Sequence, residues 1–203
     1  MFPPLTDVVK SLIIINVLMF IGTNIAGTEI QYLLSAHYPS SKLFQPFQLI
    51  THMFMHGGNA HIFFNMYALF LFGVPLERHF GPKKFLIYYL LSGFGGLILY
   101  MLIMFIQINF MGMDVNINTH LLGASGAVFG LLAGFGVLYA NTTLQLLIPP
   151  IPMKAKYFVM IYGAIELFLG FSGWDTGIAH FAHIGGAVAG LLILWHWGLL
   201  NRR

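Results

Sequence analysis

Long apolar stretches with almost no charge constrain this chain more than any other feature of its sequence. Charged residues make up 7% of the 203 residues and hydrophobic residues 58%, whereas soluble globular domains carry about 25% charged residues. Several stretches approach the roughly 20 residues with which a helix crosses the hydrocarbon core of a bilayer. Backbone groups in lipid must be hydrogen-bonded within the spanning structure, and the alternating pattern of a barrel is absent. The sequence therefore predicts an all-α, polytopic membrane bundle.

We expect six transmembrane helices in a single domain that covers residues 1–203. Turn-forming residues separate the apolar stretches. The expected helices cover residues 11–26, 59–76, 85–107, 123–140, 157–171 and 179–199. The first loop, residues 27–58, is apolar enough to lie partly in the membrane interface.

The basic residues predict the orientation, because cytoplasmic loops are enriched in Lys and Arg. Among the nine, only Lys42 falls on the side opposite the termini. The other eight are Lys10, Arg78, Lys83, Lys84, Lys154, Lys156, Arg202 and Arg203. Both termini should therefore be cytoplasmic, and we expect the membrane to be the inner (plasma) membrane of a bacterium.

Composition also excludes several functions. The chain has no Cys, which rules out disulfides, a thiolate nucleophile and Cys-based metal sites. The net charge of +3 is scattered over loops, which does not indicate a nucleic-acid partner. His52 and His56 have the spacing of metal ligands, but no HExxH motif or nearby acid accompanies them. We interpret this pair as loop packing and expect neither a metal nor a cofactor.

Polar side chains gather near one end of three expected helices. In the predicted topology, His61 and Asn65, then Ser125, then His183 lie within about two turns of the non-cytoplasmic side. Each alone has an ordinary explanation, such as a serine bonded back to its own helix or an Asn that joins two helices. Their shared depth favours one polar site, because each polar group within a span costs free energy.

The residues around Ser125 suit a nucleophile. Gly123, Ala124 and Gly126 flank it and leave its hydroxyl accessible to another chain. A helix N-terminus supplies N–H groups and positive partial charge for a developing oxyanion. Histidine is the usual base that activates a serine near neutral pH.

Small residues explain how a base could reach this serine. His183 is followed by Gly186 and Gly190, a spacing that lets membrane helices pack closely. If this face meets Gly126 and Gly130 of the fourth helix, His183 comes within reach of Ser125. His61 and Asn65 would then direct hydrogen-bond donors at the same point.

Three sequence blocks together resemble the rhomboid family of intramembrane serine proteases. They are His52-x3-His56-x4-His61-x3-Asn65, Gly123-Ala124-Ser125-Gly126 and Ala182-His183-x2-Gly186-x3-Gly190, in the family's order on its second, fourth and sixth helices. The resemblance implies that Ser125 is the nucleophile and His183 the base. It further implies an oxyanion site at His61, Asn65 and the Ser125 backbone N–H. We also expect Gly123 and Ala124 to belong to this site.

The resemblance also implies the partners of this chain, and the sequence departs from the family pattern at a few positions. The implied partners are single-pass transmembrane substrates in the lipid bilayer, cleaved near the top of their helix without metal or organic cofactor. Members often carry Trp-Arg where this chain has Phe47-Gln48, which leaves the anchoring of the first loop open. Phe129 replaces a frequent Tyr and still permits stacking on His183. The oligomeric state is left open.

Glu166 is the only carboxylate inside an expected helix. A Ser-His-Asp type triad needs an acid beside its base, and the sixth helix has none. We therefore predict a Ser-His dyad, and we interpret Glu166 as a neutral or hydrogen-bonded lining residue in preference to a catalytic or gating role.

Two other functions fit a chain of this kind. A catalytically silent, client-binding relative would usually lack the serine or the histidine. A small transporter would line a route across the whole bilayer, but here the polar residues stop at one side.

Substrate and water must reach the site among the helices. The short fifth helix is followed by Ser172 and Gly173, which favours a hinge. Phe168 and Phe171 would close against Phe63 or Phe64 as a lateral gate, or are simply lipid-facing bulk.

Overall fold

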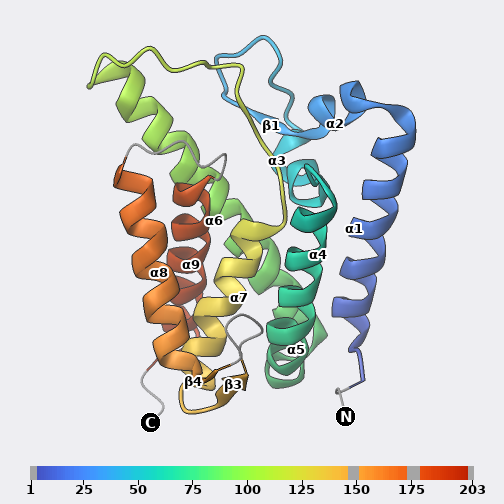
Figure 1. The fold of residues 1–203 in the computed structure, drawn as a ribbon, viewed down its shortest axis with the longest axis vertical. Coiled ribbons are helices and arrows are strands. Elements are labelled where there is room, and N and C mark those ends of the chain that lie inside the picture. Colours follow the sequence, from blue (N-terminus) through green and yellow to red (C-terminus); the bar gives the residue numbers. More distant parts are fainter. Residues whose placement is uncertain (1–3, 146–150, 173–178, 201–203) are drawn as a thin grey trace.

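The computed structural model describes residues 4–145, 151–172 and 179–200, and most of them lie in the helices of a bundle (Figure 1). Gly173, Arg202 and Arg203, which entered the expectations above, lie outside these ranges. The helices are α1 (Asp7–Ala26), α2 (Thr28–Leu34), α3 (Gln48–Thr51), η1 (His52–Phe54), α4 (Asn59–Ala68), η2 (Leu69–Gly73), α5 (Val74–Phe80), α6 (Pro82–Asn109), α7 (Ser125–Leu138), α8 (Ala155–Ser172) and α9 (His180–His196). The strands are β1 (Ala36–His37), β2 (His120–Leu121), β3 (Thr143–Gln145) and β4 (Pro152–Lys154).

A helix occupies each of the six positions that the sequence predicts, with ends that agree within four residues. The second is continuous from Asn59 to Phe80 through η2. Among the described residues, four helices are long and apolar enough to cross a membrane: Asp7–Ala26, Asn59–Phe80, Pro82–Asn109 and Ala155–Ser172. Helices α7 and α9 are apolar but shorter. The chain is therefore a mostly helical membrane protein, and the count of six spans stays a prediction.

The purely helical prediction misses short strands at both ends of the bundle. β1 pairs antiparallel with β2, with Ala36 opposite Leu121 and His37 opposite His120. β3 pairs with β4 in the same sense. A strand of two or three residues has no detectable period in a sequence. Its pairing depends on contacts that only the folded chain provides.

Gln48 anchors the first loop. Because this chain has Phe47-Gln48 in place of Trp-Arg, the sequence left the anchoring of this loop open. Its side-chain amide nitrogen donates to the carbonyl oxygens of Leu33 and Leu43 at 2.9 Å. Its side-chain oxygen accepts from the backbone N–H groups of His37 and Gln45 at 3.3 and 3.1 Å. The side chain is fully buried. One buried amide therefore ties four separate points of the loop together.

Helix α7 forms the centre of the bundle. Every residue from Gly126 to Phe135 is buried, and α6, α8 and α9 pack around it (Figure 1). A helix that is apolar on all sides is expected in such a position. The extended segment before α7 descends beside α4, so α7 begins partway down the bundle (Figure 1). Because α7 begins at Ser125, this residue lies inside the bundle and not at its end.

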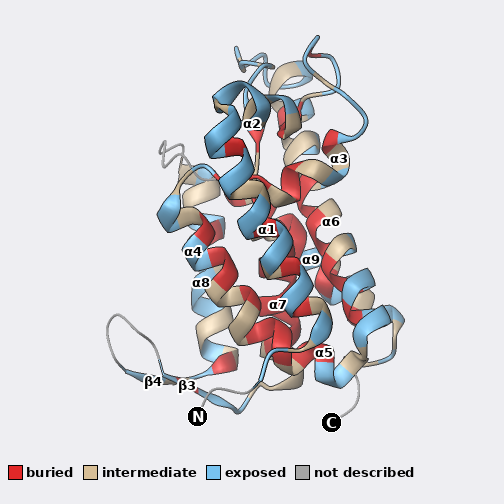
Figure 2. Cartoon of the chain, turned by 90° about the vertical axis from the view of Figure 1, so that its right-hand side faces the viewer, coloured by how far each residue is buried: buried red, intermediate tan, exposed pale blue. Residues whose placement is uncertain are grey.

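The outer surface of the bundle is apolar. Buried residues concentrate on α6, α7 and α9, whereas outward faces of the peripheral helices are exposed (Figure 2). Side chains such as Ile25, Phe63 and Phe168 are exposed on these faces. Large exposed apolar surfaces of this kind suit lipid and not water. This arrangement agrees with the membrane location inferred from composition.

Candidate active site

The structure brings Ser125 and His183 together, although 58 residues separate them. Ser125 is the first residue of α7, and His183 lies in the first turn of α9. His183 Nε2 is 2.9 Å from Ser125 Oγ. A serine hydroxyl in hydrogen-bond contact with an imidazole is the pair needed for nucleophilic catalysis.

Glycine contacts between α7 and α9 create this proximity. A Cβ on Gly186 would lie 1.9 Å from the carbonyl oxygen of Gly126, and one on Gly190 would lie 3.0 Å from that of Gly130. The two backbones therefore touch without intervening side chains. The Tyr88 hydroxyl of α6 donates to the Gly130 carbonyl at 2.8 Å, which fixes a third helix to the same seam.

Stacked aromatic rings hold the imidazole plane. Phe129 lies parallel to His183, with ring centroids 4.2 Å apart and an interplanar angle of 8°. Tyr162 of α8 also stacks on Phe129, with ring centroids 5.4 Å apart. Packing alone therefore fixes the plane of the His183 ring, independently of its hydrogen bonds.

The segment just before Ser125 is held by the loop that contains His52. The Gly123 N–H donates to the His52 carbonyl at 2.9 Å, and Gly123 has a φ of +123° that favours glycine. Burial lowers the pKa of His52 to about 4, so the ring is neutral near pH 7 and its Nδ1–H donates to the Gln48 carbonyl at 2.8 Å. This agrees with the interpretation of His52 as a packing residue.

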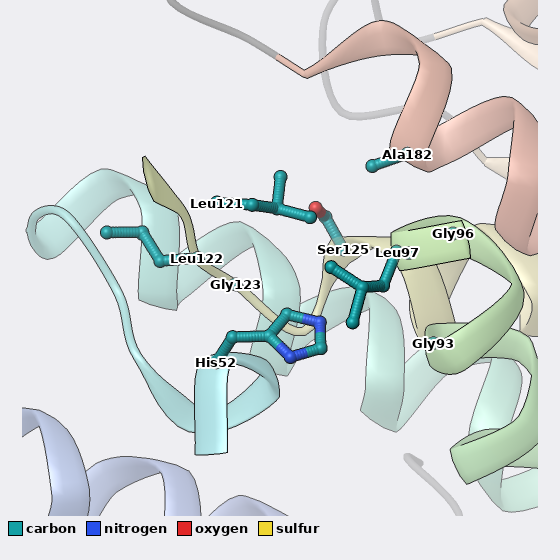
Figure 3. Close-up of a pocket in the computed structure, with 10 residues that line it drawn as sticks. His52, Gly93, Gly96, Leu97, Leu121, Leu122, Gly123, Ser125 and Ala182 are labelled. Atoms are coloured by element: carbon teal, nitrogen blue, oxygen red, sulfur yellow. The ribbon is translucent and has the colours of Figure 1, made fainter. Parts of the chain in front are cut away.

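A small cavity adjoins the serine. Its volume is about 10 Å³, close to the minimum that one water molecule needs. Figure 3 shows Ser125 beside Leu121 and Ala182 on one side and His52 on the other. The remaining lining comes from Gly93, Gly96, Leu97, Leu122, Gly123 and Gly126.

His61 lies beside Gly123. A Cβ on Gly123 would be 2.8 Å from His61 Nε2. The Gly57 N–H donates to His61 Nδ1 at 3.3 Å, which leaves the ring proton on Nε2, the nitrogen that faces the serine segment. Asn65 is buried, and its side-chain nitrogen donates to the His61 carbonyl at 3.0 Å. The Gly123 N–H donates to the His52 carbonyl, and the part of Gly123 in an oxyanion site stays a prediction.

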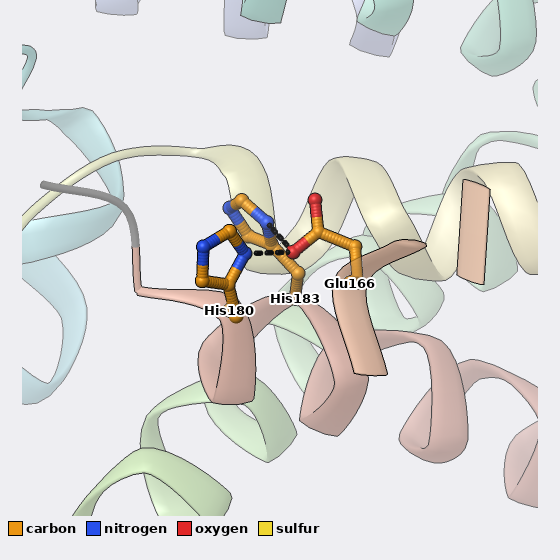
Figure 4. A group of neighbouring side chains, drawn as sticks. All are labelled: Glu166, His180 and His183. Atoms are coloured by element: carbon orange, nitrogen blue, oxygen red, sulfur yellow. Dashed lines mark hydrogen bonds and ion pairs between the residues drawn. The ribbon is translucent and has the colours of Figure 1, made fainter. Parts of the chain in front are cut away.

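Glu166 contacts the histidine that touches the serine. Its Oε2 is 3.0 Å from His183 Nδ1 and 2.6 Å from His180 Nδ1 (Figure 4). The expectation that Glu166 lines the bundle did not identify these partners. The available signal was its status as the only carboxylate inside an expected helix. For His180, one turn before His183, the sequence predicts only a place as a solvated neighbour of the site.

Glu166, His180 and His183 also have the composition of a metal site. Each offers one ligand atom, and these atoms lie within 4.8 Å of one another. A metal ion there would take the Nδ1 lone pairs, so these nitrogens could no longer donate to Glu166. His52 and His56 belong to no such group among the described residues.

The proposed gate residues lie on the outer surface. Phe63 packs edge-on against Phe64 and parallel to Tyr67, both on its own helix. Phe171 packs edge-on against Phe181 of α9. Leu167, Phe168, Phe171 and Ser172 line a shallow hollow on α8. The closing of one Phe pair on the other stays a prediction.

Comparison with known proteins gives a consistent result. Residues 43–199 match the Rhomboid domain. RHOMBOID-like protein 4 of Arabidopsis thaliana is 35% identical over 163 residues, which cover 77% of this chain and 36% of that protein. Rhomboid protease AarA of Providencia stuartii is 30% identical over 146 residues, 70% of this chain and 52% of that protein. Putative rhomboid protease YdcA of Bacillus subtilis (strain 168) is 30% identical over 156 residues, 72% of this chain and 64% of that protein. The matched part is thus about half or less of the first two proteins.

Proposed function

This chain belongs to the rhomboid family, and on that premise we propose that it is an intramembrane serine endopeptidase that uses Ser125 and His183. The observation that carries the proposal is the 2.9 Å contact between His183 Nε2 and Ser125 Oγ on two separate helices. Two relatives with protease in their names support the same class of activity. Both residues are present, which argues against a catalytically silent, client-binding relative.

The chemistry follows from this contact. Ser125 Oγ attacks the carbonyl carbon of the scissile peptide bond as its proton passes to His183 Nε2. The C–N bond then breaks, and the same proton passes to the leaving amine. Water hydrolyses the resulting acyl-enzyme by the reverse sequence of proton transfers. No metal or organic cofactor enters these steps.

Hydrogen-bond donors around Ser125 would stabilise the oxyanion. We assign this role to His61 Nε2–H, the Asn65 side-chain amide and the Ser125 backbone N–H, beside Ala124. His61 is supported by the 2.8 Å separation between its Nε2 and a Cβ position on Gly123. Such donors act on charge that develops only in the transition state. Gly126, Phe129, Gly186 and Gly190 support the pair by packing.

The substrate would be a single-pass transmembrane protein that reaches the site from the bilayer. With both termini cytoplasmic and six spans, as the basic residues favour, Ser125 faces the non-cytoplasmic half of the membrane. Cleavage would then fall near that end of the substrate helix. A movement of α8 that separates Phe168 and Phe171 from Phe63 and Phe64 would open a lateral path for the substrate into the site. The bacterial inner membrane stays a prediction, and the relatives include a plant protein named as mitochondrial.

Cleavage in a defined membrane tests this function. The purified chain is reconstituted in liposomes with single-pass model substrates that carry different tags at their two ends. We expect two fragments whose new ends map to the non-cytoplasmic part of the substrate helix. Ser125→Ala, prepared in parallel, is the control for contaminating proteases. Equal cleavage by this variant, or no cleavage of any of a panel of substrates by the native chain, would contradict the proposal.

A further inference from the structure

Glu166 is placed where a third member of a catalytic triad would lie. It comes from α8, whereas Ser125 and His183 come from α7 and α9. The line of contacts runs from Ser125 Oγ to His183 Nε2 at 2.9 Å, and from His183 Nδ1 to Glu166 Oε2 at 3.0 Å. Each imidazole nitrogen thus has one partner, and the two partners have different chemical roles.

The burial of Glu166 calls for an explanation. α8 is a peripheral helix, and its buried residues are Ala155, at its first position, and Glu166. Glu166 is 5% exposed. A carboxylate turned inward from a lipid-facing helix is costly unless it is paired. Here two imidazoles of α9 contact the same oxygen, His180 at 2.6 Å and His183 at 3.0 Å (Figure 4).

This contact determines which nitrogen of His183 carries the proton. A carboxylate accepts and cannot donate, so the Nδ1–H of His183 donates to Oε2. Nε2 is then left as the acceptor for the Ser125 hydroxyl. Phe129 stacking sets the plane of the ring but cannot choose between the two tautomers. The carboxylate is the group that does so.

From this geometry we propose that Glu166 is a positioning residue of the proteolytic reaction, which holds His183 in the productive tautomer and stabilises the imidazolium. The inference rests on the proposed function. It replaces the dyad predicted from sequence with a Ser-His-Glu arrangement. Glu166 does not take a proton during the reaction; the proton moves between Ser125 Oγ, His183 Nε2 and the leaving amine. His180 shares the carboxylate and keeps it fixed.

Glu166→Gln is the sharpest test, because glutamine keeps the shape and removes the charge. We expect kcat to fall on the order of 10²-fold with little change in KM. In soluble proteases, loss of the acid costs up to about 10⁴-fold. The stacked Phe129 retains part of the ring orientation here, which makes the expected loss smaller. Rates are expressed per folded enzyme and measured with EDTA, so that a divalent ion at these three residues does not contribute.

The split between kcat and KM separates positioning from a structural role. A lower folded fraction reduces the amount of active enzyme but leaves kcat per folded enzyme unchanged. Loss of the carboxylate that selects the tautomer of His183 lowers kcat per folded enzyme itself. His180 and the stacked Phe129 are the same in both proteins, so the change in kcat reports the carboxylate.

Glu77→Gln provides the matched control. Glu77 is also buried, but it accepts the backbone N–H groups of Val8 and Val9 at 3.0 and 2.8 Å, away from the serine. Its loss should lower thermal stability and leave kcat per folded enzyme unchanged. If Glu166→Gln behaves like Glu77→Gln, the positioning role is wrong while the protease function stands. An inactive native chain would overturn the proposed function, and this inference with it.

Discussion

Ser125→Ala and His183→Ala are each expected to lower kcat by about 10⁴-fold or more while the protein still folds and inserts. Without the hydroxyl there is no nucleophile, and without the imidazole nothing accepts its proton at neutral pH. The side chains touch each other across 2.9 Å, so they act as one unit. The measurement is the rate of fragment release from a reconstituted single-pass substrate, with the folded fraction checked by thermal unfolding.

The double variant makes this prediction sharper. If the two residues form one unit, Ser125→Ala with His183→Ala should be no slower than either single variant. Asn65→Ala provides an internal comparison, because loss of one oxyanion donor costs about 10²–10³-fold in a soluble protease and leaves KM nearly unchanged. Additive losses in the double variant, or cleavage by Ser125→Ala at a rate close to native, would show that the pair is not the catalytic unit.

Gly186→Ala is expected to damage the fold itself. The added Cβ would lie 1.9 Å from the Gly126 carbonyl oxygen and 2.7 Å from its carbon. These are backbone atoms at the centre of the bundle and cannot rotate away, so α7 and α9 must separate. We expect the free energy of unfolding to fall by about 3 kcal/mol, the upper part of the usual overpacking range. Thermal unfolding in detergent should show a Tm lower by roughly 6–12 °C, with activity lost in parallel.

Gly22→Ala is the matched control for this variant. Gly22 also lies within a membrane helix, α1, but a Cβ there meets nothing within 4 Å. The same chemical change should be neutral or stabilise by up to about 1 kcal/mol, because alanine loses less conformational entropy in a helix. A Gly186→Ala protein as stable and active as Gly22→Ala would show that the close contact between α7 and α9 is not required.

The helices and the serine–histidine pair could be predicted from the sequence for a physical reason. In a membrane, apolar length and the positions of Gly and Pro largely decide where helices lie. The small residues at 126, 130, 186 and 190 could therefore indicate which two helices touch. Membrane interiors also tolerate few polar groups, which makes residues such as Ser125 and His183 conspicuous.

The contacts of Glu166 could not be predicted from the sequence. Its helix position was predictable, but the direction of its side chain depends on how α8 rotates against α9. α8 is mostly lipid-facing, so its own apolar pattern does not define that rotation. The strand pairing of His37 with His120 and the four contacts of Gln48 likewise depend on loop geometry. Such features have no period in the sequence and appear only in the folded chain.

Covalent trapping of the nucleophile tests the central claim most directly. The native chain is treated in liposomes with a serine-directed fluorophosphonate, and the modified residue is identified by mass spectrometry of the digested protein. The hydroxyl of Ser125 should carry the label, and His183→Ala should suppress it because the unactivated hydroxyl reacts slowly. Label on another residue of the folded native chain, or equal labelling of Ser125 without His183, would contradict the account.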